Sequence, residues 1–438
     1  MHPDIYEALA RTAQLLRMDV FRSKADRDPQ IIDGLRATTV RIVSDAANLR
    51  TPAGQTLLVS LYSQLAMTGL TVDVDVANVE LLVPQPPLRD DLRLVDALED
   101  YSDDLLPEGF SRSTARSPDL TFVLGDSPFR GAAVRIGAAD NCALVTYDSA
   151  ADVRVSGEEP FGAIAAAAAG CAEAVRWAVP LIAEDLSIDR ATLPKAWLPS
   201  VVRRIDLDLG EIARSRLTGT VDVLSGGAIT NAFLYTMLRV HGSSGLRLRV
   251  VEPERLDLSN LNRYALARRR FVGELKTTML ETYSTPSVVI EGVPMRLDFS
   301  NAVSLEPWAS RVIVGVDDIP SRWCIQERAA TSWLAVGATS HDYVLVSEHA
   351  PDQPCAGCAH PSDEQVAGPL PTIGFVSLWA GLMLTRRLLA VRRVMETTAV
   401  QVWPLGLENA RGIHAFGQAA AVDCPVQCAA SRCIRGAA

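Results

Sequence analysis

The sequence predicts an α/β protein with two domains. With 438 residues, the chain is long enough to bury more than one hydrophobic core. Val221–Leu224 is typical of a short strand, and the turn at Gly226 and Gly227 leads into Ile229–Val240, whose length suits a helix. A second β-like run follows at Leu246–Val251. This strand–turn–helix–strand order is typical of a parallel sheet covered by helices.

The first half of the chain shows the same alternation. Thr38–Val43 and Leu70–Val76 are predicted strands on either side of a helix at Pro52–Gly69. Two more strands are expected at Leu120–Leu124 and Cys142–Tyr147. These runs predict a second βαβ-like unit, which lacks a glycine row for binding phosphate.

Two long apolar helices are expected at corresponding places in the two halves. One is the alanine-rich stretch that begins at Pro160, and the other is Leu370–Val394. Ser287–Ile290 and Arg311–Val316 are predicted strands between them. Leu193–Leu217 contains two prolines and is expected to connect the halves.

The turn Ser225-Gly226-Gly227-Ala228 is suited to binding a phosphate group. It places backbone N–H groups and a helix N-terminus together after a strand. Glu252 ends the next strand, where an acid would hold a ribose hydroxyl. A three-glycine dinucleotide fingerprint would have glycine in place of Ser225 and Thr230, so the glycine pattern alone is a weak signal.

Three further motifs point to one family. They are Ser259-Asn260-Leu261-Asn262-Arg263, Val272-Gly273-Glu274-Leu275-Lys276 and Gly315-Val316-Asp317-Asp318, the last followed by Arg322. Together they resemble the adenylating domain of the ubiquitin-activating (E1), ThiF and MoeB family, over residues of about 200 to 433. The resemblance implies a Rossmann-like fold that uses ATP and Mg²⁺.

The resemblance also assigns roles to residues of the second half. Gly226 and Gly227 would lie against the nucleotide, and Glu252 would bind the ribose in place of the aspartate usual in the family. The residues expected on the ATP phosphates are Asn260, Arg263 and Lys276, and Asp317 is expected to bind Mg²⁺. Arg263, Lys276 and Asp317 would be catalytic, because fixed positive charge stabilises the charge that builds up on phosphoryl oxygens.

The family also suggests how the first half is built. We interpret residues of about 36 to 190 as a degenerate copy of the same fold without the nucleotide residues, and place the domains at 1–195 and 196–438. An unrelated α/β domain is the alternative. A homodimer is usual in the family, and an internal repeat could replace the second subunit. Arginines that could reach the ATP site from the connecting segment are Arg203, Arg204, Arg214 and Arg216.

Composition excludes some classes of protein. The net charge of −10 argues against nucleic acid as a partner, because a phosphate backbone selects basic surfaces. No signal peptide is visible at the N-terminus. The apolar stretches Phe161–Ile182 and Phe375–Leu384 carry charges or are too short, so we interpret them as buried helices and not membrane spans. We therefore expect the cytoplasm and no membrane partner.

The eight cysteines include a cluster suited to metal. Cys355 and Cys358 form a C-x-x-C pair, and the resemblance implies a structural Zn²⁺ held with a second pair, Cys424 and Cys428. Cys433 could replace either late ligand. A redox dithiol is the alternative for the C-x-x-C pair.

A thioester cysteine, which ubiquitin-activating enzymes need, is harder to find. The loop Ala359–Thr372, where relatives often carry it, has no cysteine, and Cys324 is the nearby candidate. This favours direct transfer of the adenylate to another nucleophile.

These features predict an ATP-dependent E1-like adenylyltransferase. It would activate the C-terminal carboxylate of a ubiquitin-like or sulfur-carrier protein, or of a peptide, and release pyrophosphate. One alternative is an E1-like enzyme that modifies peptides in natural-product biosynthesis. Another is a non-catalytic scaffold that binds a ubiquitin-like partner. A Rossmann dehydrogenase is disfavoured, because hydride transfer has no need of the Asn-Leu-Asn-Arg and lysine motifs.

Overall fold

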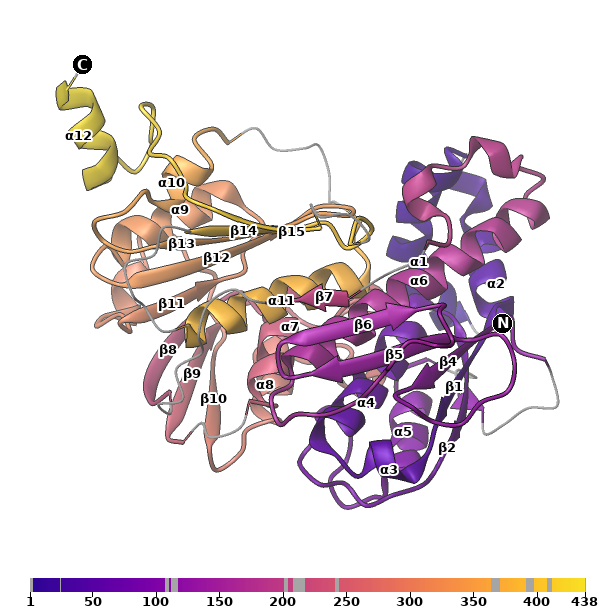
Figure 1. Ribbon diagram of the computed structural model, residues 1–438. Coiled ribbons are helices and arrows are strands. Elements are labelled where there is room, and N and C mark those ends of the chain that lie inside the picture. Colours follow the sequence, from indigo (N-terminus) through magenta and orange to yellow (C-terminus); the bar gives the residue numbers. More distant parts are fainter. Residues whose placement is uncertain are drawn as a thin grey trace.

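The computed structural model contains two α/β halves, each with one mainly parallel sheet (Figure 1). It describes residues 3–23, 25–106, 110–111, 117–200, 204–207, 217–240, 244–363, 371–390, 398–407 and 412–437. Arg203, Arg214, Arg216 and most of the loop that follows Cys358 lie outside the described residues.

The first half begins with helices and then forms a seven-stranded sheet. Its strands are β1 (Thr39–Ser44), β2 (Thr71–Val76), β3 (Phe110–Ser111), β4 (Leu120–Leu124), β5 (Val134–Ala139), β6 (Cys142–Thr146) and β7 (Arg204–Asp206). Its helices are α1 (Pro3–Leu15), α2 (Asp28–Ala37), α3 (Ala46–Leu49), α4 (Pro52–Thr68), α5 (Leu94–Asp103) and α6 (Phe161–Asp185), with a π-helical segment η1 (Leu16–Phe21) and 3₁₀ turns η2 (Ala25–Arg27), η3 (Arg190–Thr192) and η4 (Lys195–Trp197).

The second half forms an eight-stranded sheet. Its strands are β8 (Gly219–Leu224), β9 (Leu246–Val251), β10 (Val288–Val293), β11 (Arg311–Val314), β12 (Trp333–Thr339), β13 (Val344–His349), β14 (Ala399–Val402) and β15 (Ile413–Phe416). Its helices are α7 (Ala228–Met237), α8 (Lys276–Glu281), α9 (Ile319–Arg328), α10 (Ala356–Ala359), α11 (Gly374–Leu389) and α12 (Ala429–Ala437), with 3₁₀ turns η5 (Leu258–Asn260), η6 (Arg269–Phe271) and η7 (Ala302–Leu305).

The two sheets share one topology. The first runs β3-β2-β1-β4-β5-β6-β7, and the second runs β10-β9-β8-β11-β12-β13-β14 before it adds β15. In each sheet the first five of these strands are parallel and the next two are antiparallel. The predicted Rossmann-like α/β fold is therefore confirmed, and the first half repeats the strand order of the second.

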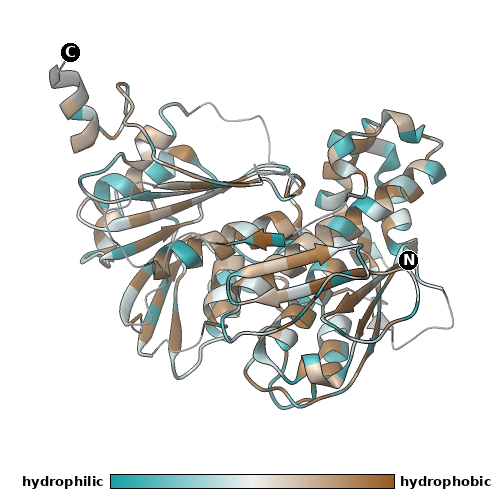
Figure 2. Cartoon of the chain, viewed as in Figure 1, coloured by the Kyte–Doolittle hydropathy of each residue, from teal (hydrophilic) through white to brown (hydrophobic). Residues whose placement is uncertain are grey.

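A layer of helices joins the halves. Helix α11 packs on α7 and on α6, and α6 packs on α4, so the long helices lie in the middle of the molecule (Figure 1). One continuous apolar core runs from α1 through this layer to the second sheet, and the apolar residues concentrate there (Figure 2). The alanine row of α6 is buried throughout, because small side chains let neighbouring helices approach closely.

Two buried arginines, one on each long helix, each contact the backbone of the other half. Arg176 on α6 donates to the backbone oxygen of Leu405, which follows β14. Arg386 on α11 donates to the backbone oxygen of Leu207, which follows β7, at 2.7 Å. Each long helix thus binds the backbone just beyond β7 or β14, which are corresponding strands of the two sheets, and this reciprocal arrangement joins the halves.

The predicted elements are found with small shifts at their ends, and several strands were missed. The strands that were not predicted are β3, β5, β7, β12, β13, β14 and β15. The expected connector contains β7, which belongs to the first sheet although it lies beyond residue 195. The domain boundary itself stays a prediction.

Within the described residues one helix, α6, is long and apolar enough to cross a membrane. Its apolar window is 83% buried inside the fold, as expected for a core helix. The cytoplasm stays our prediction for the compartment.

The contact between α7 and α11 depends on Gly381. A Cβ atom at this position would lie 2.2 Å from the backbone carbonyl carbon of Ala232, which cannot move aside. We predict that Gly381→Ala lowers the free energy of unfolding by ~2 kcal/mol or more, through overpacking. Urea unfolding measures this change.

Gly170→Ala on α6 is the matched control. Its new Cβ would meet the side-chain ends of Ile136 and Leu61, at 2.8 and 3.1 Å, and these can shift. Alanine also favours the helix by ~1 kcal/mol, so the control should change stability little. Equal losses in both variants would contradict the assignment of Gly381 to a rigid backbone contact.

Candidate nucleotide-binding site

The turn after β8 is built around Glu252. The N–H of Gly226 donates to Glu252 Oε2 at 2.6 Å, and the N–H of Glu254 donates to Oε1 at 2.9 Å. Both oxygens of this buried carboxylate therefore shape the turn and the end of β9. A Cβ atom on Gly226 would lie 2.8 Å from Glu252 Cγ, so only glycine fits there. The ribose-binding role of Glu252 stays a prediction.

Ser225 adopts a left-handed backbone conformation, with φ of 97°. This conformation favours glycine, and a residue with a side chain is strained in it. Its Oγ accepts the N–H of Gly227 at 2.9 Å, which ties the serine to the turn. The structure therefore has the glycine-like conformation of the fingerprint without the glycine.

Thr230 takes the place of the other expected glycine, and the structure shows how it fits. A Cβ atom on Gly315, the residue after β11, would lie 2.7 Å from Thr230 Oγ1. The close approach of helix α7 to the sheet thus depends on a glycine on the neighbouring strand. The sequence pattern could not show that Gly315 makes room for the Thr230 side chain, because the two residues are distant in sequence.

Lys276 begins helix α8 beside the turn. Its Nζ lies 2.6 Å from Glu254 Oε2 and 5.4 Å from the centre of the Tyr264 ring. Burial acts to lower the pKa of Lys276, but Tyr264, Glu252 and Glu254 outweigh it, so the pKa is raised. The lysine is therefore a buried cation, paired with a carboxylate that is itself largely exposed.

Arg263 lies near the same ring, with its Cζ 5.4 Å from the centre of Tyr264. It donates to the backbone oxygen of Ser259 at 2.6 Å and to Asn262 Oδ1 at 2.7 Å. Burial lowers the pKa of Arg263, and the charge of Arg11 lowers it further. Arg11 belongs to α1, so the first half contributes positive charge near Arg263.

Asn260 has a structural role in this loop. Its Oδ1 accepts the N–H of Asp257 at 3.0 Å, while Asp257 accepts the N–H of Ser259 at 2.8 Å. The two side chains cap the 3₁₀ turn η5 reciprocally. The predicted contact of Asn260 with phosphate stays a prediction.

The first half supports the same loop. Asn262 Nδ2 donates to Thr12 Oγ1 on α1 at 3.0 Å. The buried Arg268 pairs with Asp100 Oδ2 at 2.6 Å and with Asp104 Oδ2 at 2.8 Å. These contacts fix the segment between Arg263 and Lys276.

The two acids after β11 differ in role. Asp318 accepts the N–H of Ser321 at 2.7 Å and caps helix α9. Asp317 is exposed at the carboxyl edge of the sheet. Arg322 on α9 is buried. Its Nε donates to the backbone oxygen of Val316 at 3.0 Å, and its Nη1 lies 3.0 Å from His360 Nε2. The strand order reverses between β8 and β11, and ligands of open α/β sheets bind at such a point.

Four cysteines converge as predicted. The sulfur atoms of Cys355, Cys358, Cys424 and Cys428 all lie within 4.8 Å of one another. Cys355 Sγ is 3.3 Å from Cys424 Sγ, and Cys358 Sγ is 3.6 Å from Cys428 Sγ. The exposed Cys433 lies outside the cluster. Four thiols at this spacing suit one tetrahedral metal ion.

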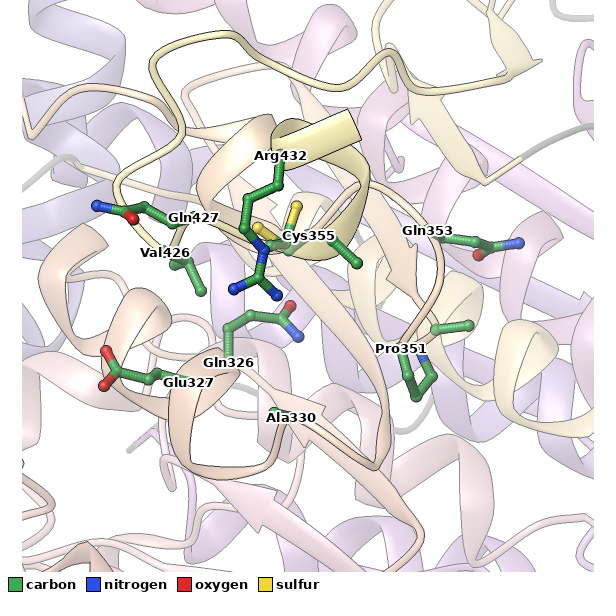
Figure 3. Close-up of a pocket in the computed structure, with 12 residues that line it drawn as sticks. Gln326, Glu327, Ala330, Pro351, Gln353, Cys355, Val426, Gln427 and Arg432 are labelled. Atoms are coloured by element: carbon green, nitrogen blue, oxygen red, sulfur yellow. The ribbon is translucent and has the colours of Figure 1, made fainter. Parts of the chain in front are cut away.

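A pocket of about 270 Å³ adjoins this cluster (Figure 3). Cys355, Gln326, Glu327 and Arg432 are among the residues that line it, and the side chain of Arg432 extends from α12 across it (Figure 3). None of the predicted nucleotide residues lines this pocket.

Cys324 does not have the environment of a nucleophile. It is buried on α9, and burial raises the pKa of its thiol. A reactive cysteine needs the thiolate form and access to substrate.

The corresponding edge of the first sheet is closed by its own side chains. Asn48 Nδ2 donates to Ser127 Oγ at 3.0 Å, to Asp45 Oδ1 at 3.1 Å and to Asp126 Oδ1 at 3.2 Å. These residues follow β1 and β4, as Gly226 and Asp317 follow β8 and β11. The polar groups at this edge therefore bind one another.

Comparison with known proteins matches residues 235–405 to the ThiF family. A region of 215 residues is 33% identical to the uncharacterized protein y4jF of Sinorhizobium fredii, over 46% of this chain and 38% of that protein. The adenylyltransferase and sulfurtransferase UBA4 of Candida albicans is 27% identical over 173 residues, which are 35% of this chain and 38% of that protein. The chain thus spans less than half the length of these relatives.

Solved structures also match part of the chain. Escherichia coli MccB with AMPCPP and MccA has a TM-score of 0.40 and 13% identity, over 47% of this chain and 66% of that one. PaaA has a TM-score of 0.37 and 13% identity, over 45% of this chain and 72% of that one. The match to the ThiF family lies within the second half of the chain.

Glu252→Gln tests how the turn is held. An amide cannot accept two N–H groups as a carboxylate does, so one backbone donor loses its partner. We predict a loss of ~1–3 kcal/mol in the free energy of unfolding, measured by urea denaturation. Glu291→Gln is the control, because Glu291 pairs with Arg247 at the surface and should contribute little. Similar losses in both variants would contradict this account of the turn.

Proposed function

We propose that this chain is an ATP-dependent adenylyltransferase that activates the carboxylate of a peptide or of a small carrier protein. One observation carries the proposal. The buried Lys276 and the partly buried Arg263 lie around Tyr264 near the glycine turn, at the point where the strand order reverses, and Asp317 follows the strand on the other side of that point. The ThiF-family match and the adenylyltransferase UBA4 support the same chemistry.

The arrangement suits attack on the α-phosphate of ATP. A carboxylate oxygen of the substrate would bond to the α-phosphorus, and the bond from that phosphorus to the bridging oxygen would break. The bridging oxygen leaves with pyrophosphate, and an acyl-adenylate remains. Arg263 and Lys276 are fixed before the reaction, so they stabilise the developing charge at little reorganisation cost. Lys276 would exchange Glu254 for a phosphate.

Asp317 is the residue that would hold Mg²⁺. Its carboxylate is exposed at the ligand edge, while its neighbour Asp318 is committed to capping α9. Oxygen ligands suit Mg²⁺, which usually binds through one or two carboxylates and substrate phosphates. The ion would add positive charge at the phosphates.

We also propose that the acyl group passes directly from the adenylate to an outside nucleophile. The sequence has eight cysteines, and four of them converge on one cluster. Cys171 and Cys324 are buried, Cys142 belongs to β6 of the first half, and Cys433 lies on the C-terminal helix α12. None of them offers an accessible thiolate beside Asp317.

The C-terminal carboxylate of a ubiquitin-like or sulfur-carrier protein, or of a peptide, remains the proposed substrate. An enzyme that modifies peptides in natural-product biosynthesis would form the same adenylate. The two functions would therefore use the same nucleotide site and differ in the group that accepts the acyl group. Because the first half packs along the helix layer, we propose that it takes the place of the second subunit of a homodimer. Arg11 on α1, and not the connector arginines, would then add charge from that half. Arg204, the one described connector arginine, instead pairs with Asp206 at the surface.

Asp317→Asn tests the reaction most simply, with Asp318→Asn as its control. Asparagine at 318 still caps a helix, whereas asparagine at 317 removes the charge proposed to bind Mg²⁺. We predict that Asp317→Asn lowers ATP–pyrophosphate exchange by about 100-fold or more, because it removes a metal ligand from phosphoryl transfer. The control should retain most of the exchange.

The assay uses a pool of candidate carrier proteins and peptides, because exchange requires the acyl substrate. Exchange that survives in Asp317→Asn and fails in Asp318→Asn would contradict the assigned roles. No exchange together with no binding of MgATP would favour the scaffold alternative.

The cysteine cluster is proposed to hold one structural Zn²⁺. We predict one zinc per chain by elemental analysis, lost in Cys355→Ser and retained in Cys433→Ser. Loss of the metal should also lower the free energy of unfolding, because the metal binds the folded chain through four cysteine thiolates and its binding energy is then lost. Zinc retained in Cys355→Ser, or lost in Cys433→Ser, would contradict the assigned ligands.

A further inference from the structure

Tyr264 lies close to both cations of the candidate site. The centre of its ring is 5.4 Å from Arg263 Cζ and 5.4 Å from Lys276 Nζ. Both distances are in the range of cation–π attraction. The side chain is only 4% exposed, and the backbone N–H of Tyr264 donates to the oxygen of Asn260 at 3.1 Å. The ring is therefore a buried contact that both cations share.

The hydroxyl group of Tyr264 faces the glycine turn. A Cβ atom on Gly227 would lie 3.8 Å from Tyr264 Oη. Gly227 is also the residue that precedes the first turn of α7, a helix of ten residues. The hydroxyl thus lies beside backbone N–H groups at a helix N-terminus, where an anion is favoured.

This hydroxyl makes no hydrogen bond to the part of the chain that the structure describes. Two other tyrosines, Tyr235 and Tyr283, differ in this respect. Tyr235 Oη pairs with Ser60 Oγ at 2.8 Å, and Tyr283 Oη donates to the oxygen of Leu266 at 2.7 Å. Phenylalanine would provide the same ring at position 264. The Tyr264 hydroxyl is thus left free to donate to a ligand, as a phenolic O–H can.

We propose that the Tyr264 hydroxyl donates a hydrogen bond to a phosphate oxygen of the bound nucleotide, while its ring positions Arg263 and Lys276. The inference rests on the proposed function of the site. The chemistry suits the group, since a phenolic O–H is a donor and phosphate oxygens are strong acceptors. Tyr264 would then be a binding residue for the polyphosphate and not for the nucleoside.

The test compares Tyr264→Phe with Tyr283→Phe. The first variant keeps the ring and removes only the hydroxyl proposed to bind phosphate. The second removes a hydroxyl that binds the backbone oxygen of Leu266. Calorimetric titration of the full chain with MgATP, inorganic tripolyphosphate and adenosine gives the affinities, and the thermal midpoint of each variant monitors folding.

We expect Tyr264→Phe to bind MgATP and tripolyphosphate about 10-fold more weakly than the wild type, as for loss of a hydrogen bond to a charged group. Adenosine affinity should not change in this variant. Tyr283→Phe should leave all three affinities unchanged. Tyr264→Leu, which also removes the ring, should weaken tripolyphosphate binding further than Tyr264→Phe.

Each other outcome overturns one part of the account. Unchanged affinity of Tyr264→Phe for MgATP and tripolyphosphate would overturn the inference, and so would an equal loss for adenosine. If the wild type bound tripolyphosphate but not MgATP, the proposed function would fail, while a weaker response in Tyr264→Phe would still support the hydroxyl. If the wild type bound none of the three probes, both proposals would be overturned.

Discussion

The candidate site depends on one constraint, which is that the first half fixes the loop that carries Arg263 and Lys276. Arg268, between these cations, is buried against Asp100 and Asp104 of the first half. Asn262 binds Thr12 on α1. A buried ion pair such as this strongly penalises removal of either partner, so the halves are expected to fold and act together.

The halves share a topology and differ in the hydrogen bonds at the carboxyl edge of each sheet. In the first half Asn48 binds Asp45, Asp126 and Ser127, so the polar groups at the edge satisfy one another. In the second half Glu252 uses its oxygens to hold an open turn, and the hydroxyl of Tyr264 has no partner among the described residues. One edge is therefore complete without a ligand, whereas the other presents cations and donors to one.

Sequence reasoning located the second-half motifs because each is local. The strand before Gly226, the acid at Glu252 and the cysteine pairs are defined by their near neighbours in sequence. Strands β12 to β15 were missed, and only the pairing of β13 with β14 joins segments that lie far apart in the chain. The roles of Gly315 and Arg11 also could not be predicted, since each depends on packing against a residue distant in sequence. Ser225 was counted as a departure from the fingerprint, yet its backbone adopts the conformation that the fingerprint requires.

The central claim is that this chain has one nucleotide site, at the carboxyl edge of the second sheet. Calorimetric titration with MgATP tests it most directly, with Lys276→Ala and Asn48→Ala as variants at the two corresponding edges. The account predicts one ATP per chain, lost in Lys276→Ala and unaffected by Asn48→Ala. Two ATP per chain, or binding that survives in Lys276→Ala and disappears in Asn48→Ala, would contradict it.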